Sequence, residues 1–233
     1  MKTNNNFFRF LQVLALVSVC NSAAFAQVAP SSADQAGYEG LLAAASQNNS
    51  VQIQQLAAAG AEVEIRDSNG RTPLHVAAFG GNHASMRVLV AAGADPNALD
   101  NDRYDMVTIA AVANDLKTLN MALALGNSAK NITSRYDGTA LIAAAHLGHA
   151  EVVYSLIRAG APLDHVNNLR WTAVIESIVL GNGGKNHIDT LGHLIQAGAN
   201  INLADGNGQS PLKLAKMRGY STMVKMLEAA GAR

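Results

Sequence analysis

The chain has 233 residues, with 17 basic and 17 acidic side chains, so its formal net charge is zero. This balance offers no basic surface for nucleic acid or an anionic membrane, and we expect neither as a partner. The single cysteine, Cys20, excludes a disulfide within the chain, so stability is expected to come from packing.

Residues 1–26 have the pattern of a secretory signal peptide. Lys2 and Arg9 supply positive charge, and the apolar run "FLQVLALVSVC" that follows is shorter than the ~20 residues of a membrane-spanning helix. The tripeptide "AFA", which ends at Ala26, has the small-x-small pattern of a cleavage site. We therefore expect export through the Sec pathway and cleavage before Gln27.

An alternative for the same segment is a lipid anchor on Cys20. Val19 stands directly before this cysteine, where a lipobox requires a small residue, so the sequence favours a cleaved signal peptide and no membrane anchor. The next stretch, "QVAPSSADQAG" (27–37), is small, polar and contains proline. This composition predicts a flexible linker before a folded domain that begins at Tyr38.

Regularly spaced glycines mark a repeat along the rest of the chain. They are separated by 33, 33, 34, 38 and 33 residues and are Gly60, Gly93, Gly126, Gly160, Gly198 and Gly231. An apolar residue stands 19 positions before most of them, as Leu74 does before Gly93. These intervals predict one domain over 38–233, with six repeats at 38–66, 67–99, 100–133, 134–166, 167–204 and 205–233.

Each repeat has the pattern of two short antiparallel helices. Alanine-rich segments such as "LHVAAFG" come first, and a second apolar stretch such as "VVYSLIRAG" follows. Small side chains such as Ala77 and Ala78 allow neighbouring helices to approach closely, and the closing glycine can take the left-handed conformation that ends a helix. A single pair cannot bury its apolar face, but stacked pairs share a continuous core.

The segment "NGRTPLHVAAFGG" (Asn69–Gly81) carries the most specific motif. Its "TPLH" (Thr72–His75), together with the closing turn "AAGADPN", resembles the ankyrin repeat. The other repeats have "DMVT", "TALI", "TAVI" and "SPLK" at the same place, and the first has "GYEGLL". The resemblance implies an all-α solenoid of about six helix-turn-helix units joined by β-hairpin-like loops, with the first and last units as caps.

The resemblance also implies a protein partner, which ankyrin repeats bind through their hairpin tips and the concave face of the first helices. By this resemblance, two positions of each repeat face a partner. One is the residue directly before the Thr of the Thr-Pro pair, and the other is the residue seven positions after that Thr. The candidates at these positions are Arg71, Phe79, Tyr104, His146, Trp171, Gln209 and Met217. Arg, Tyr and Trp are frequent at interface hot spots. The alternatives are packing between repeats for Phe79 and coverage of a neighbouring loop for Trp171.

The fifth repeat departs from the rule by five extra residues, which we place in "NGGKNH" (Asn182–His187) as an enlarged loop between its two helices. In the same repeat, Glu176 occupies a position that is apolar elsewhere, so we expect at least partial burial and a need for partners. One interpretation is that Glu176 holds the inserted loop through Lys185 or through backbone N–H groups. The others are that it reaches solvent at a loosened repeat, or that it acts on a ligand.

Enzymatic interpretations find little support. The segment "GNGGKN" lacks the first glycine and the Ser or Thr of a phosphate-binding loop. His146 and His149 are spaced to share a metal on a helix, but no Cys or carboxylate set completes a site, and structural roles are favoured for both and for His75. We expect the His75 imidazole to bond the hairpin backbone and to rigidify adjacent repeats.

These observations predict an exported, monomeric, non-catalytic protein-binding module that acts in the periplasm, without cofactor or metal. The alternative is a secreted effector that binds host proteins, and an enzyme or metal-binding protein comes third.

Overall fold

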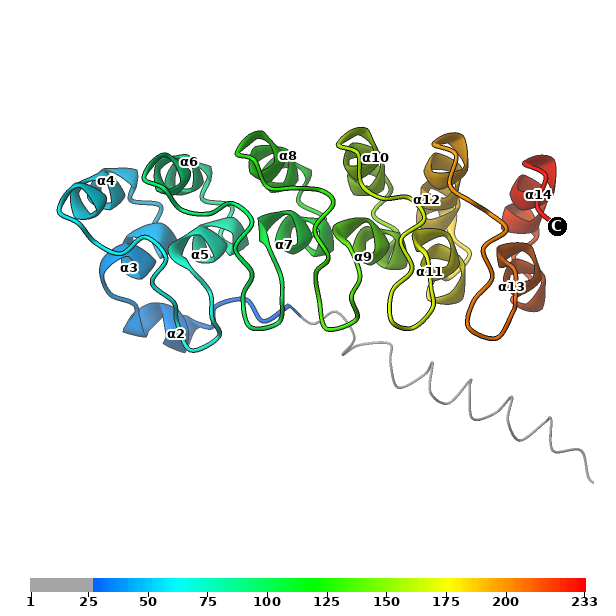
Figure 1. The fold of residues 1–233 in the computed structure, drawn as a ribbon, viewed down its shortest axis with the longest axis horizontal. Helices are drawn as coiled ribbons and strands as arrows, with labels where there is room; N and C mark the ends of the chain where they lie inside the picture. The colour runs from blue at the N-terminus through cyan, green and yellow to red at the C-terminus, as the bar shows by residue number, and fades with distance from the viewer. Residues whose placement is uncertain (1–26) are drawn as a thin grey trace, which may run out of the picture.

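The computed structural model describes residues 27–233, so the expected signal peptide lies outside the described residues. The described chain forms a short N-terminal helix, α2 (Ser32–Gly37), and then six antiparallel helix pairs stacked side by side (Figure 1). The pairs are α3 (Gly40–Ser46) with α4 (Ser50–Ala58), α5 (Pro73–Phe79) with α6 (His83–Ala91), α7 (Met106–Val112) with α8 (Leu116–Ala124), α9 (Ala140–Leu147) with α10 (Ala150–Arg158), α11 (Ala173–Val179) with α12 (Lys185–Gln196), and α13 (Pro211–Met217) with α14 (Ser221–Ala229).

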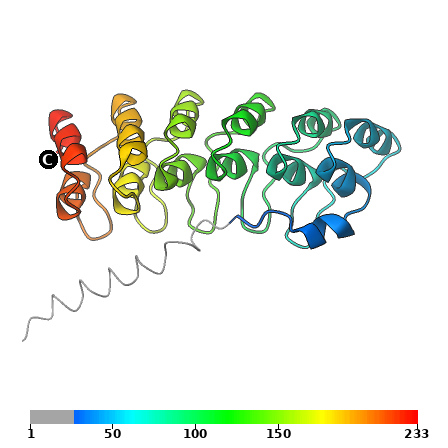
Figure 2. The same cartoon turned by 180° about the vertical axis from the view of Figure 1, so that it is seen from behind.

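The array confirms the predicted all-α solenoid. The first helices form one row and the second helices another, and a long loop joins each pair to the next (Figures 1 and 2). Over residues 27–233 there is no β-strand, and one isolated antiparallel bridge joins Thr133 to Gly138. No helix in this range is both long and apolar enough to cross a membrane.

The first helices of five repeats begin with the same kind of cap. In each, a side-chain oxygen accepts a hydrogen bond from the backbone N–H three residues later; the capping residues are Thr72, Asp105, Thr139, Thr172 and Ser210. Such a bond satisfies an N–H group that the helix itself cannot bond. The position requires an acceptor oxygen and not threonine itself, so the "TPLH" sequence can vary while the helix start is kept.

The two rows of helices are buried to different extents because the first helices are covered on more sides. Every residue of α11 is buried, whereas α10 buries only Val152, Val153 and Leu156 along one stripe. Alanines with 0% exposure, such as Ala77 and Ala144, lie in the first helices, and these helices pack against each other along the row. Their small side chains allow this close approach, and the shared core extends through all six repeats.

The six glycines that mark the repeats, from Gly60 to Gly231, all have positive φ values, which lie between 81° and 99°. They end the second helices in the left-handed conformation, as predicted. The hairpins that follow are linked between repeats by backbone bonds, including Asn101 N–H to Asn69 O at 3.0 Å and Asn168 N–H to Tyr136 O at 2.9 Å.

Gly70, at the tip of the first of these hairpins, is a position where a side chain is costly. Its φ is +72°, and an added Cβ would lie 2.2 Å from Asn101 Oδ1 and 2.9 Å from Asn101 N. We expect Gly70→Ala to lower the free energy of unfolding by about 1–2 kcal/mol, measured by urea unfolding. Gly37→Ala, where a Cβ would meet no atom within 4 Å, is the control. A Gly70→Ala protein as stable as the parent would contradict the expected strain.

Two histidines join neighbouring repeats, which confirms the link between repeats predicted for His75 and the structural role predicted for His149. His75 Nε2 lies 3.0 Å from Tyr104 O in the next hairpin, and His149 Nδ1 lies 2.9 Å from Ala111 O in the preceding repeat. Burial lowers the pKa of both imidazoles. Both side chains therefore have structural roles as neutral rings that bond backbone groups between repeats.

The insertion in the fifth repeat differs from the predicted enlarged loop. Helix α12 has 12 residues, against nine in each of the other second helices, so three of the five extra residues lengthen the helix. The prediction was wrong because Lys185, Asn186 and His187 are the first three residues of α12 and do not belong to the loop. The short loop is held by Asn182, whose Oδ1 accepts the Gly184 N–H at 2.9 Å, and by Tyr220, whose hydroxyl donates to Gly181 O.

Candidate partner-binding face

Residues 27–37 are not a flexible linker in this structure, in contrast to the prediction. We call this segment the strap. It folds into α2 behind a capping box between Ser31 and Asp34, and it lies beneath the first helices of the early repeats (Figure 1). At its start, Gln27 donates from Nε2 to Thr108 O of α7 at 2.9 Å. The prediction of a linker rested on the small, polar composition of the segment. Composition alone does not reveal specific contacts such as the hydrogen bond of Gln27.

The strap is tied down by Arg71, whose side chain is 0% exposed. Nη1 donates to Val28 O at 2.8 Å, and Nη2 lies 3.2 Å from Asp34 Oδ2. On its other side, Nε donates to Asp67 Oδ2 at 2.6 Å. Arg71 is therefore not an exposed anchor as predicted, because the strap and its own hairpin occupy its guanidinium.

Asp67 organises the hairpin side of this cluster. Burial disfavours its ionised form, but hydrogen bonds from Tyr38, from the Arg71 backbone and from the Arg71 side chain outweigh burial and lower its pKa. The Tyr38 hydroxyl donates to Asp67 Oδ2 at 2.7 Å, and burial together with this bond raises the pKa of Tyr38. Asp67 is thus an ionised partner that holds Arg71 in place.

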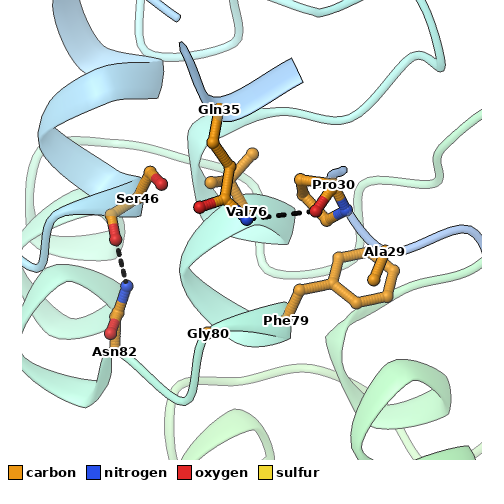
Figure 3. A pocket seen from close by; sticks show the side chains of 8 residues that line it. All are labelled: Ala29, Pro30, Gln35, Ser46, Val76, Phe79, Gly80 and Asn82. Carbon is orange, nitrogen blue, oxygen red and sulfur yellow. Dashed lines mark hydrogen bonds between the residues drawn. The ribbon is translucent and has the colours of Figure 1, made fainter. Parts of the chain in front are cut away.

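The strap also covers an apolar part of the same face. Ala29 and Pro30 line an open pocket of about 110 Å³ together with Val76, Phe79 and Asn82 (Figure 3). Gln35 closes one side, and its Nε2 donates to Pro30 O at 3.0 Å. Phe79 is half-buried against this pocket, so its ring faces the strap.

The first-helix face, formed by the first helices and the hairpin loops, therefore has two halves. In repeats one to three, which we call the covered half, Arg71 and Tyr104 are buried, and Tyr104 is only 5% exposed. Tyr104 was predicted as a contact residue, and its burial in the core makes that role wrong for this structure. In repeats four to six, the open half, the remaining candidates are half-buried or exposed: His146, Trp171, Gln209 and Met217.

Glu176 lies beneath the open half with 0% exposure, which confirms the predicted burial. Its Oε2 is 3.2 Å from His146 Nδ1, and its Oε1 accepts from Asn167 Nδ2 at 3.0 Å. Burial raises the pKa of Glu176, and the bonds from His146 and Asn167 offset only part of this effect. The interpretation that Glu176 reaches solvent is therefore wrong.

Glu176 does not hold the inserted loop either. Lys185 is 84% exposed and pairs with Asp189 within α12. The carboxyl group of Glu176 acts instead on the fifth hairpin, because Asn167 Oδ1 accepts the backbone N–H of Trp171 at 2.9 Å. Glu176 thus positions two of the predicted contact residues, His146 directly and Trp171 through Asn167.

His187 completes this support from the second helix. Its Nε2 lies 2.9 Å from His146 O, and its Nδ1 lies 3.2 Å from Asn182 Oδ1 in the inserted loop. His146, His149 and His187 are near each other, but no group of three His, Cys, Asp or Glu side chains in residues 27–233 could hold a metal ion. The arrangement can fix side chains of the open half in place, and it offers no metal site within the described chain.

Family comparisons bear on the same repeats. A family model described as ankyrin repeats in three copies matches residues 12–100, and one for a single ankyrin repeat matches residues 136–168. A crystal structure of an ankyrin repeat domain from Acinetobacter baumannii AYE is 43% identical, with a TM-score of 0.77, and the match covers 83% of this chain and 98% of that one. The chain belongs to the ankyrin-repeat family.

Other relatives agree with this assignment of the ankyrin chain. The ankyrin repeat protein YahD of Escherichia coli K12 is 32% identical over 120 residues, which are 51% of this chain and 60% of YahD. The ankyrin repeat domain of Bcl-3 is 30% identical, with a TM-score of 0.74 over 84% of this chain and 88% of that one. Ankyrin repeats are in general protein interaction modules and non-catalytic, so the family supports a protein partner without identifying it.

Proposed function

We propose that this ankyrin chain is an exported, monomeric, non-catalytic module that binds a partner protein in the periplasm through the open half of its first-helix face. The signal-peptide pattern of residues 1–26 supports export. The observation that carries the binding site is the positioning of Trp171 and His146 by the buried Glu176. A large aromatic side chain held on a rigid support is the kind of residue that dominates binding energy.

The surface around these residues fits a folded partner or one of its loops. Met217, 51% exposed on the last first helix, and the half-buried Gln209 extend the open half towards the C-terminus. Met adapts its shape to a partner, and Gln209 Nε2 already donates to Asn207 O in its own hairpin. The resulting surface has a rigid aromatic centre and an adaptable edge.

We expect the double variant Trp171→Ala/Met217→Ala to lose at least tenfold in the amount of partner captured in cells. The measurement is affinity capture of the exported protein after chemical crosslinking, with periplasm and medium analysed separately. Tyr154→Ala is the matched control. Tyr154 is 46% exposed on the second helix α10, and its ring lies beside the ring of His193 on the next second helix, α12.

Each outcome separates the proposal from its rivals. A periplasmic partner that is lost in the double variant and kept in Tyr154→Ala supports the proposal. Full capture by a folded double variant would contradict the open half as the site. A partner recovered only from the medium would contradict the periplasmic location and favour the secreted effector.

A further inference from the structure

We propose that the strap is a displaceable cover over a second subsite, and that this subsite accepts an acidic segment of the partner protein. The inference rests on the proposed function and extends it to the covered half.

The strap is held by few contacts. Helix α2 has no buried residue, and Val28 is 52% exposed. The contacts that fix it to the repeats are mainly polar: Gln27 to Thr108 O, Val28 O to Arg71, and Asp34 to Arg71. Because it contributes little apolar burial, a segment with similar polar groups can replace it at low cost.

Beneath the strap, the guanidinium of Arg71 is already oriented by residues outside the strap. Nε of Arg71 is bonded to Asp67 within the hairpin, and Asp67 also accepts from Tyr38. These bonds do not involve residues 27–37, so departure of the strap leaves the guanidinium oriented. Nη1 and Nη2, which now bond Val28 O and Asp34 Oδ2, then become available. A positioned guanidinium with free donors selects carboxylate groups.

The strap itself shows what the subsite accepts. It presents a backbone carbonyl at Val28 and a carboxylate at Asp34 to one guanidinium, and it places Ala29 and Pro30 between them against Val76 and Phe79. The matching partner segment therefore has a short extended stretch of small apolar residues, followed by a helical turn that carries one acidic side chain, as Asp34 is carried by α2.

The covered half also adjoins the open half directly. Gln27 ends over α7, and the next helix in the row, α9, carries His146 at its end. A partner segment that enters at Arg71 can therefore continue along the row of first helices towards Trp171. One partner can occupy both halves without changing direction.

The test uses the full chain as processed by the cell and a synthetic probe peptide with the sequence of residues 27–37, "QVAPSSADQAG". In the parent, the attached strap competes with the probe at a high effective concentration. Asp34→Asn in the chain weakens the strap, so we expect the probe to bind this variant at least tenfold more tightly than the parent by isothermal titration. Asp189→Asn, which removes an exposed carboxylate of α12, is the matched control and should behave as the parent does.

A second probe, with asparagine in place of its aspartate, tests the acidic requirement and should bind the Asp34→Asn chain at least tenfold more weakly than the first probe. Equal binding of the first probe to parent and Asp34→Asn, or equal binding of both probes, would overturn the inference. Neither titration needs the partner. The two proposals can fail separately. If the probes bind as expected but Trp171→Ala/Met217→Ala still captures the partner fully, the proposed function of the open half is contradicted and the subsite beneath the strap is supported.

Discussion

Replacing Asp105 with alanine is expected to lower the free energy of unfolding by about 3–5 kcal/mol. This carboxylate is 1% exposed and accepts the Thr108 N–H at 2.8 Å and the Thr108 hydroxyl at 2.7 Å. Its other oxygen accepts from Asn127 Nδ2 at 2.9 Å and from Asn131 Nδ2 at 2.8 Å. Alanine removes one acceptor from each of these four donors and removes the cap of α7, while the two asparagine amides keep a second acceptor, Asn97 Oδ1.

Urea unfolding measures this loss, and Asp102→Ala is the control. Asp102 pairs at the surface with Arg135, whose side chain is 70% exposed, so its removal should change the stability by less than about 1 kcal/mol. An Asp105→Ala protein within about 1 kcal/mol of the parent would contradict the assigned network.

The double variant Asp105→Thr/Asn127→Ala probes the same network. Asn127 follows a repeat-marking glycine where the other repeats have alanine, and Asp105 stands where three of them have threonine. The double variant restores both residue types. We expect it to be more stable than Asp105→Ala, because the threonine cap and the removal of the Asn127 amide together with its acceptor outweigh the loss of the Val107 N–H bond to Asn127 Oδ1.

The second large effect is expected at Glu176. Glu176→Ala should lower the free energy of unfolding by about 2–4 kcal/mol, because it leaves a cavity and removes the partner of both His146 and Asn167. Glu176→Gln should be close to the parent at neutral pH. Its amide can donate to His146 Nδ1 and accept from Asn167 Nδ2, so both contacts of the carboxyl group can be kept.

The pH dependence follows from the raised pKa of Glu176. A carboxyl group whose pKa is higher in the folded state than in the unfolded state binds its proton more tightly when folded. Its contribution to stability is complete below the unfolded pKa of 4.5 and is lost as the pH rises through the raised folded value. His75 and His149 act in the opposite sense, since their lowered pKa values reduce stability as the pH falls.

Comparing Glu176→Gln with the parent isolates the carboxyl group from these histidines. From pH 4 to pH 8, we expect the stability of Glu176→Gln relative to the parent to increase. A difference that stays constant with pH would mean that Glu176 has the same pKa in both states, which would contradict the raised pKa of the folded state.

The spacing of glycines was sufficient to predict the fold because a left-handed helix end at Gly60, Gly93 and their equivalents requires this residue type. The site was less predictable. Glu176 was identified as unusual, but its partner Asn167 was missed. The sequence does contain the signal, because Asn167 stands where Asp67, Asp100 and Asp205 stand in other hairpins. An amide can donate to a buried carboxyl group, and an aspartate there would repel it.

Asp105 and Asn127 are a similar pair, because both differ from the residue type usual at their positions and they bond each other. A residue that breaks the pattern of a repeat is therefore best interpreted together with other unusual residues in the same repeat. The strap could not be predicted in this way. Its residues belong to no repeat, and its attachment depends on single polar groups such as Asp34, whose partner Arg71 lies far away in the sequence. Arg71 consequently appeared to be exposed when it is buried.

The most direct test of the partner-binding account places a photo-crosslinking amino acid at position 171, 217 or 154 of the exported chain in living cells. The account predicts crosslinks to one common partner from positions 171 and 217, on the open half, and none to it from position 154, on the second-helix row. A partner that crosslinks at position 154 and at neither of the other two would contradict the assignment of the open half as the binding face.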